Sequence, residues 1–216
     1  MRRGWWLLGV ALVVMVLVRG FLVQSFFVPS SSMEPTLHPG DRIVVATVAP
    51  ASGLHRGDLV VFDGTSVFAR KAVDPAASGT LRRALASLQA ALSLPTDESD
   101  YVKRVIGLPG DRVRCCEESG RVQVNGRSVD EPYVMPGDTP SDVRFDVTVP
   151  NGRVWVLGDH RSRSADSRSH LGDPGGGMVP VSDLIGRPIL VYWPLQHARS
   201  LARQPTLAGL PRGGDE

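Results

Sequence analysis

The chain has 216 residues, with 24 basic and 22 acidic side chains and a formal net charge of +2. This length fits one domain with short appendages and is enough to bury a core without disulfides or a metal. The near-neutral charge gives no support for nucleic-acid binding. The 23 glycines and 17 prolines predict many turns, which favours a β-rich domain over a helical bundle.

The N-terminal segment has the character of a membrane anchor. Arg2 and Arg3 precede an apolar run of 14 residues at 5–18, and Arg19 and a second apolar stretch follow it. Counted on to residue 23, the segment spans about 28 Å, close to the ~30 Å hydrocarbon core of a bilayer. A cleaved signal peptide also has a charged start, but no small-x-small cleavage site follows closely, so we expect an uncleaved anchor. The positive-inside rule predicts residues 1–4 in the cytoplasm, 5–25 in the membrane and the remainder outside.

The body of the chain predicts short strands that follow Gly-Asp turns. An Asn125-Gly126 pair between alternating residues is typical of a two-residue hairpin. Helices and strands do not alternate regularly, which argues against a doubly wound parallel sheet. We therefore expect a mainly β domain over residues 26–195, with antiparallel sheets or a distorted barrel. The predicted strands are 43–48, 59–62, one that begins at 113, 122–129, 154–157 and 188–193.

Two segments depart from the strand pattern. Residues 74–98 form an insert in which leucines recur at helical spacing, at 81, 85, 88 and 92. We expect a short surface helix that covers the sheet, and a helix lying on the membrane is the alternative. Residues 196–216 carry Pro, Gly and Arg without periodicity, which predicts a mostly disordered tail.

The two cysteines, Cys115 and Cys116, are adjacent in the sequence. Thiols outside the cytoplasm tend to oxidise, although a bond between neighbours closes a strained ring. The sequence favours a vicinal disulfide narrowly over two free thiols, and a bond between molecules is a further alternative. Two cysteines alone make no persuasive metal site, and we expect no metal and no cofactor.

Lysine usage points to a candidate base. Lys71 and Lys103 are the two lysines among 24 basic residues. An arginine keeps its proton in a protein, whereas a desolvated lysine can lose it and act as a base. In an extended segment Lys103 shares a face with Tyr101 and Val105, and burial there would lower its pKa. Ser32, in a Ser-rich hexad after the anchor, is the candidate nucleophile. A polar linker and a surface lysine are the plainer alternative.

A third segment, residues 156–168, is dense in charged and hydrogen-bonding groups. With the serine and lysine segments it resembles bacterial type I signal peptidases. The resemblance covers the core of residues 5–195 but neither the insert nor the tail. It rests, in chain order, on Pro29-Ser-x-Ser-Met-x-Pro-Thr-Leu37, Arg56-Gly-Asp-Leu-Val-Val-Phe62, Tyr101-Val-Lys-Arg-x-x-Gly-x-Pro-Gly-Asp111 and Gly158-Asp-x-Arg-x-x-Ser-x-Asp-Ser-Arg168.

The resemblance implies a single-pass serine endopeptidase of the bacterial cell membrane, with an extracytoplasmic catalytic domain. It would remove signal peptides from exported preproteins by cutting after small-x-small residues. Its partners would be preproteins and the lipid bilayer, without nucleic acid, metal or cofactor.

The resemblance also implies a role for each matching residue. Ser32 looks like the nucleophile and Lys103 the general base. Ser30 looks like the partner of the Ser32 N–H in an oxyanion hole, and Ser164 looks like the group that orients the lysine. Structural support would come from Asp159, Asp166 and Arg168, and the substrate pockets from Phe26, Val28, Met33, Tyr101 and Val102.

Two positions depart from the family pattern and leave alternatives open. His160 and Arg163 stand where Asn is common, so a pairing of Ser32 with His160 is a weaker alternative for the site. A self-cleaving Ser–Lys protease of the repressor type is a second alternative, and the anchor argues against it. A catalytically inactive membrane-anchored scaffold is a third, and the presence of both Ser32 and Lys103 argues against it.

Overall fold

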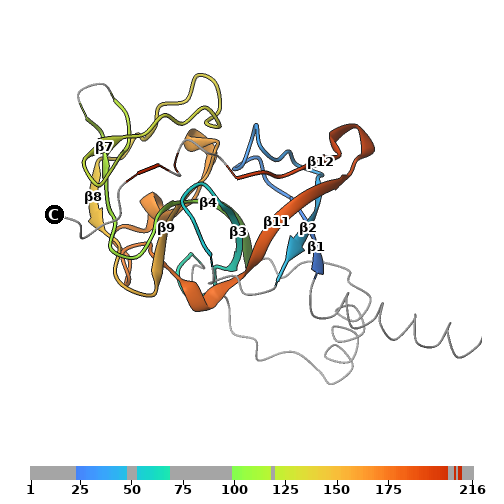
Figure 1. The fold of residues 1–216 in the computed structure, drawn as a ribbon, viewed down its shortest axis with the longest axis horizontal. Coiled ribbons are helices and arrows are strands. Elements are labelled where there is room, and N and C mark those ends of the chain that lie inside the picture. The colour runs from blue at the N-terminus through green and yellow to red at the C-terminus, as the bar shows by residue number, and fades with distance from the viewer. Residues whose placement is uncertain are drawn as a thin grey trace, which may run out of the picture.

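The computed structural model describes residues 23–47, 53–68, 99–117, 120–203, 207 and 209–210. This part of the chain is built from antiparallel strands and short 3-10 turns, so the predicted mainly β fold is confirmed (Figure 1). An eight-stranded sheet has the order β1-β2-β11-β3-β4-β9-β10, with β12 paired to β11. A second, four-stranded sheet has the order β7-β6-β5-β8.

The strands of the larger sheet include all those that surround the site described below. β11 passes from β3, which it pairs at Leu184 and Gly186, to β2, which it pairs from Arg187 onward, so the sheet curls into a half-barrel (Figure 1). The larger sheet consists of β1 (Val23–Phe27), β2 (Arg42–Ala46), β3 (Leu59–Asp63), β4 (Asp100–Gly107), β9 (Arg153–Leu157), β10 (Val179–Pro180), β11 (Leu184–Trp193) and β12 (Arg199–Ser200).

The smaller sheet confirms the hairpin that the sequence predicts. Asn125 and Gly126 both have positive φ, at 51° and 73°, which is the geometry that a two-residue primed turn requires. The four strands are β5 (Arg112–Cys115), β6 (Gln123–Val124), β7 (Arg127–Ser128) and β8 (Phe145–Thr148). Short 3-10 turns complete the described part: η1 (Arg161–Arg163), η2 (Ser167–His170), η3 (Val181–Asp183) and η4 (Leu195–His197).

Three strands of the two sheets begin directly after the same kind of turn, a residue pair followed by Gly-Asp. In each turn a carboxylate oxygen of the aspartate accepts a hydrogen bond from the backbone N–H three residues earlier, at 2.8–2.9 Å. The aspartates Asp41, Asp58 and Asp111 are all buried, with 0%, 6% and 1% exposure. The turns therefore set the starts of β2, β3 and β5.

Buried apolar side chains form three clusters. Trp155 belongs to the one beneath the four-stranded sheet, and Phe62 to the one between β3, β4 and β9. Met33 and Leu37 belong to the third, together with apolar residues of β2, β3 and β11. This third cluster anchors the loop 28–41, so the candidate nucleophile Ser32 lies on a fixed support.

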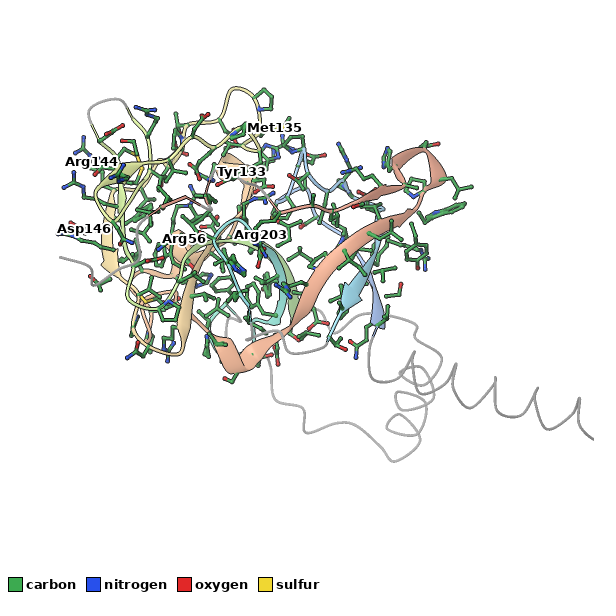
Figure 2. The ribbon with its side chains drawn as sticks, in the orientation of Figure 1. Arg56, Tyr133, Met135, Arg144, Asp146 and Arg203 are labelled. Carbon is green, nitrogen blue, oxygen red and sulfur yellow. A yellow bond between two sulfur atoms is a disulfide. The ribbon has the colours of Figure 1, made fainter. Side chains whose placement is uncertain are left out.

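The structure differs from the disorder predicted for the tail where it describes that segment. Arg199–Ser200 form β12, Leu207 is fully buried in the cluster around Trp155, and Arg203 Nε donates to Asp58 at 2.8 Å. Arg203 and Arg56 both project over the middle of the domain in Figure 2, and Arg56 Nη1 donates to the Leu210 carbonyl. A strand pairing and one buried leucine therefore hold described residues of the predicted tail, without any periodic pattern.

The predicted anchor lies outside the described residues up to residue 22, and Val23–Ser25, its last three residues, belong to β1. Of the insert at 74–98, none of the residues is described. Over the part of the chain that the structure covers, there is no helix with the length and apolar character needed to span a bilayer.

Candidate active site

The structure brings Ser32 and Lys103 into direct contact. Lys103 Nζ donates a hydrogen bond to Ser32 Oγ at 2.7 Å. Ser32 lies on the loop after β1 and is 7% exposed, and Lys103 lies on β4 and is 3% exposed. The two residues are 71 positions apart in sequence. The fold therefore forms the hydroxyl–amine pair that the sequence predicts.

Burial gives the lysine amine an unusual acidity. Desolvation lowers the pKa of Lys103 to about 8, although the Asp166 and Asp159 carboxylates act to raise it and Arg168 adds to the lowering. The Tyr101 ring, whose centroid is 5.9 Å from Nζ, gives the amine a partly apolar neighbour on the same face of β4. An amine with such a pKa is partly neutral near pH 7 and can accept a proton.

The surroundings of Ser32 provide donors for a developing oxyanion. Ser30 Oγ is 3.2 Å from Ser32 Oγ, as its predicted role requires. The Ser32 carbonyl accepts a hydrogen bond from His160 N–H at 3.1 Å, which fixes the peptide plane. Among the described residues no acceptor for the Ser32 N–H is present, so this donor is open to an incoming ligand.

Gly158 lies where the loop after β9 meets the nucleophile. A Cβ at this position would lie 2.6 Å from the Ser32 carbonyl oxygen and closer still to the Ser164 side chain. Ser164 Oγ is buried and makes no hydrogen bond to Lys103 in this structure, and its hydroxyl is among the groups that lower the pKa of Asp166. The lysine-orienting role of Ser164 therefore stays a prediction.

Asp159 supports the site from below. Arg104 binds both of its carboxylate oxygens, at 2.8 Å and 2.5 Å, and the Thr36 hydroxyl donates to the same group. The Arg104 guanidinium also lies over the Tyr133 ring, 4.1 Å from its centroid. Arg104 neighbours Lys103 on β4, so this buried pair links the lysine strand to the nucleophile loop through Thr36.

Asp166 and Arg168 form a second buried pair beside the lysine. Burial opposes ionisation of Asp166, but hydrogen bonds and charge from Arg168 outweigh it and hold the pKa of Asp166 below its usual value. Asp166 also accepts from Gly158 N–H at 3.0 Å, and Arg168 donates to the Arg161 carbonyl at 2.8 Å. Both residues thus lie behind the lysine in a hydrogen-bonded pair, and their supporting role stays a prediction.

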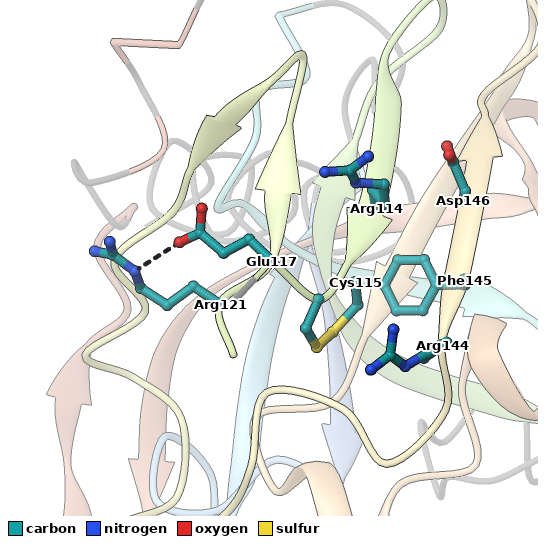
Figure 3. A pocket seen from close by; sticks show the side chains of 8 residues that line it. Arg114, Cys115, Glu117, Arg121, Arg144, Phe145 and Asp146 are labelled. Carbon is teal, nitrogen blue, oxygen red and sulfur yellow. Dashed lines mark hydrogen bonds and ion pairs between the residues drawn. A yellow bond between two sulfur atoms is a disulfide. The ribbon is translucent and has the colours of Figure 1, made fainter. Parts of the chain in front are cut away.

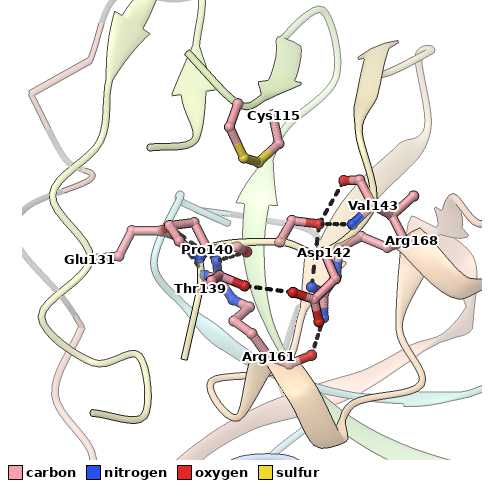
Figure 4. Close-up of a disulfide and its surroundings, with 10 residues drawn as sticks. Cys115, Glu131, Thr139, Pro140, Asp142, Val143, Arg161 and Arg168 are labelled. Atoms are coloured by element: carbon pink, nitrogen blue, oxygen red, sulfur yellow. Dashed lines mark hydrogen bonds and ion pairs between the residues drawn. A yellow bond between two sulfur atoms is a disulfide. The ribbon is translucent and has the colours of Figure 1, made fainter. Parts of the chain in front are cut away.

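Arg161 is a supporting residue that the sequence did not single out. Its guanidinium binds the Glu131 carboxylate and the Pro140 carbonyl, and its Nε donates to the Gly158 carbonyl (Figure 4). Arg161 is 3% exposed. Little in the sequence indicates this role for Arg161, because its partner Glu131 is 30 residues away and lies in an irregular loop.

Four of the five predicted pocket residues lie together. Val28 and Met33 belong to the buried cluster that anchors the nucleophile loop, and Phe26 and Val102 pack against it while partly exposed. Tyr101 packs in a different cluster, where its ring stacks on Phe62 at 5.9 Å, but it also lies beside Lys103 Nζ, so its place in a substrate pocket stays a prediction.

The positions that depart from the family pattern do not pair with the nucleophile. The Nδ1 atom of His160 lies 3.2 Å from both the Ser31 carbonyl and the Glu34 carboxylate, and Ser32 Oγ contacts Lys103 and Ser30. The Ser32–His160 alternative is therefore not formed. Arg163 is exposed at the end of η1.

A cleft of about 800 Å³ lies elsewhere, on the four-stranded sheet (Figure 3). Cys115 and Cys116 form the vicinal disulfide that the sequence narrowly favoured, and they line this cleft with Phe145 and several charged residues. The lining contains no nucleophile paired with a base, so this cleft is not a candidate for the active site.

The β fold and the buried hydroxyl–amine contact together define the class of protein, a serine endopeptidase. The family described as signal peptidase, peptidase S26, matches residues 2–193. A probable signal peptidase I of Mycobacterium leprae (strain TN) is 38% identical over 205 residues, which cover 81% of this chain and 70% of the relative. Signal peptidase I of Bacillus licheniformis is 31% identical over 201 residues, which cover 88% and 87%.

A crystal structure of signal peptidase I from Enterococcus faecalis V583 aligns with a TM-score of 0.40 and 23% identity, over 63% of this chain and 97% of that chain. The chain belongs to the signal peptidase family, peptidase S26. Its activity is that of a signal peptidase I, a serine endopeptidase that removes signal peptides.

The close packing around Gly158 predicts that a larger residue at this position lowers the cleavage activity. Gly158→Ala should lower kcat/KM for signal-peptide cleavage about 10–100-fold, because the added Cβ displaces the Ser32 carbonyl and the nucleophile with it. Gly172→Ala, at a position with open space around it, is the matched control and should cleave like the wild type. Equal activity of the two variants in a peptide-cleavage assay would contradict the proposed role of this close contact.

Proposed function

We propose that Ser32 and Lys103 form the catalytic dyad with which this chain hydrolyses the peptide bond behind a signal peptide. The observation that carries the proposal is the 2.7 Å contact between two buried side chains, one of which has a pKa near 8. No other pair of a buried nucleophile and a buried lysine occurs among the described residues, since Lys71 lies outside them.

The reaction follows from this contact. Neutral Lys103 accepts the Ser32 proton as the hydroxyl oxygen attacks the scissile carbonyl. The oxyanion forms beside the Ser30 hydroxyl and the Ser32 N–H, which stabilise it in a low-dielectric site. The Lys103 ammonium then protonates the leaving amine. The Lys103 amine, neutral again, activates the water that hydrolyses the acyl-enzyme. Each proton taken up by the lysine is released in the following step.

The sheet also offers a place for an extended substrate. β4 pairs with β9 from Arg104 onward, whereas residues 101–103 pair with β3 alone among the described strands. This leaves one backbone edge of β4 unpaired beside Lys103. A substrate segment can add to such an edge as a further strand, with its alternate side chains directed toward the Phe26, Val28, Met33 and Val102 cluster. Partly exposed apolar walls of this kind favour small residues, such as Ala, at the first and third positions before the cut.

The location of the substrate fits the predicted anchor. A tether at the N-terminus would hold the site at the outer membrane surface, where the signal segment of an exported preprotein is still embedded. Attachment of enzyme and substrate to the same bilayer raises their effective concentration. We therefore propose a single-pass membrane protein with a cytoplasmic N-terminus and an extracytoplasmic catalytic domain.

The dyad is tested by removing each partner. Ser32→Ala removes the nucleophile and Lys103→Met removes the base at nearly constant volume, so both should lose at least ~1,000-fold in cleavage of a preprotein whose signal ends in Ala-x-Ala. Ser66→Ala, at an exposed serine away from the site, is the control and should remain active. The assignment of the base is wrong if Lys103→Met cleaves at the wild-type rate.

The lysine pKa predicts the pH dependence of cleavage. Because the neutral amine is the active form, kcat/KM should rise about tenfold per pH unit below pH 8 and level off above it. A profile measured from pH 5.5 to 9.5 tests this expectation. A rising limb centred near pH 6.5 would indicate a histidine base instead.

The same pKa predicts an effect on stability. The folded pKa of Lys103 lies below the unfolded value of 10.5, so the unfolded chain binds more protons and stability rises with pH between about 8 and 10.5. Below pH 8 the fold carries the full cost of the buried charge, about 3 kcal/mol. Lys103→Met should therefore have a higher free energy of unfolding than the wild type at pH 7, in a denaturant titration, despite its loss of activity. If Lys103→Met has a lower free energy of unfolding than the wild type at pH 7, burial of the charged amine does not destabilise the fold.

A further inference from the structure

The geometry points to a second site, a divalent transition-metal site formed by His38, Asp41 and His197. One donor atom of each residue lies within 4.8 Å of the others. His38 and Asp41 flank the turn before β2, and His197 ends η4, so two segments 156 positions apart in sequence supply the donors. None of these residues belongs to the Ser32–Lys103 site, and the inference does not depend on the proposed dyad.

The carboxylate at the centre of this site is held in place. Asp41 is fully buried, and its Oδ2 accepts a hydrogen bond from the backbone N–H of His38 at 2.9 Å. Its Oδ1 lies 2.8 Å from Nδ1 of His197. One oxygen is therefore used by the backbone, and the other is directed toward the His197 imidazole.

An unpartnered ring nitrogen gives a second, independent indication of a ligand. His38 Nδ1 is buried and has no hydrogen-bond partner among the described residues. Unpaired buried polar atoms are rare in folded proteins. The His38 ring also lies close to that of His197, with centroids 5.2 Å apart and planes inclined by 42°. A cation between the two rings and Asp41 would give this nitrogen a partner.

The other Gly-Asp turns show what distinguishes this one. The Asp58 carboxylate accepts a hydrogen bond from Arg203 at 2.8 Å and lies 3.4 Å from Arg187. The Asp111 carboxylate accepts hydrogen bonds from Nε and Nη2 of Arg56. Guanidinium groups thus neutralise two of the three buried carboxylates. At Asp41 an imidazole occupies the corresponding place, and an imidazole, unlike a guanidinium, can ligate a metal.

The donor set selects the class of ion. Two imidazoles and one carboxylate suit Zn²⁺ and its spectroscopic substitute Co²⁺, and a water would complete a tetrahedral site. Donors around such an ion are about 3.4 Å apart, given metal–ligand distances of about 2.1 Å. Asp41 Oδ1 and His197 Nδ1 are closer than this, at 2.8 Å, and the His197 side chain, which is 35% exposed, can rotate to admit the ion.

Metal binding here would tie the C-terminal turn to the nucleophile loop. The Asp41 carbonyl accepts from Val28 N–H at 2.9 Å, and Arg199 donates to the Thr36 carbonyl. The loop that carries Ser32 is therefore already joined to the segment around His197, through Thr36 and through Asp41. An ion that binds the folded state alone will raise the midpoint of thermal unfolding in proportion to the logarithm of its concentration.

The test is a titration of the full-length chain, purified in detergent without a histidine tag, with Co²⁺. We expect one equivalent to bind with the visible absorption bands of tetrahedral Co²⁺, and Zn²⁺ to displace it. His38→Ala and His197→Ala should each weaken binding by more than ~100-fold, because each removes a ligand. His55→Ala is the matched control, since His55 occupies the same position in the Asp58 turn, and it should bind as the wild type does.

Two results would overturn the site: no saturable binding by the wild type, or wild-type affinity in both His38→Ala and His197→Ala. If His38→Ala does not fold, His197→Ala decides alone, because its side chain is partly exposed and lies in a short terminal turn. Circular dichroism and signal-peptide cleavage in the presence of a chelator report whether each variant is folded, independently of the metal.

Discussion

The site depends on the burial of one amine against one hydroxyl. Lys103 gains little from the fold as a cation, because desolvation outweighs the attraction of the nearby carboxylates. The fold places the amine there in spite of this cost, since the backbone of β4 is fixed by β3 on one side and by β9 beyond Arg104 on the other. A partly neutral lysine in contact with a serine is the result, and the proposed mechanism of peptide hydrolysis rests on it.

Two buried ion pairs position this contact. Arg104 and Asp159 connect the lysine strand to the nucleophile loop, and Asp166 and Arg168 hold the loop that passes behind it. Buried ion pairs contribute little net stability, because desolvation offsets their attraction. Their directional hydrogen bonds fix geometry instead. Gly158 lies between these two ion pairs, and because it has no side chain its backbone can approach the Ser32 carbonyl closely.

The three Gly-Asp turns differ in the residue that binds the buried aspartate. Each buries an aspartate that needs a positive or polar partner, and arginine supplies it at Asp58 and Asp111. At Asp41 the partner is a histidine, which changes a purely structural pair into a set of donors suited to a metal. A difference in a single partner residue, 156 positions away in sequence, thus separates two kinds of site on one local motif.

Much of the fold and the central pair could be predicted from local patterns. The Asn125-Gly126 turn and the alternating strands follow from backbone preferences, and Lys103 stood out because lysine is so rare in this chain. The β12 pairing and the burial of Leu207 could not be predicted, because one strand pair and one buried side chain leave no periodic signal. Arg161 and His197 were missed for a related reason, since their partners Glu131 and Asp41 are distant in sequence and the pairs exist only in three dimensions.

The rarity of lysine also makes the central claim directly measurable. In protein labelled with ¹⁵N at the lysine side chains, only Lys71 and Lys103 contribute Nζ signals, and Lys71→Arg assigns the remaining one. A titration of the Lys103 Nζ chemical shift in the full-length, detergent-solubilised chain should show a midpoint at about pH 8. A midpoint near the ordinary lysine value of about 10.4 would contradict the account, because the amine would then be charged whenever it meets the serine.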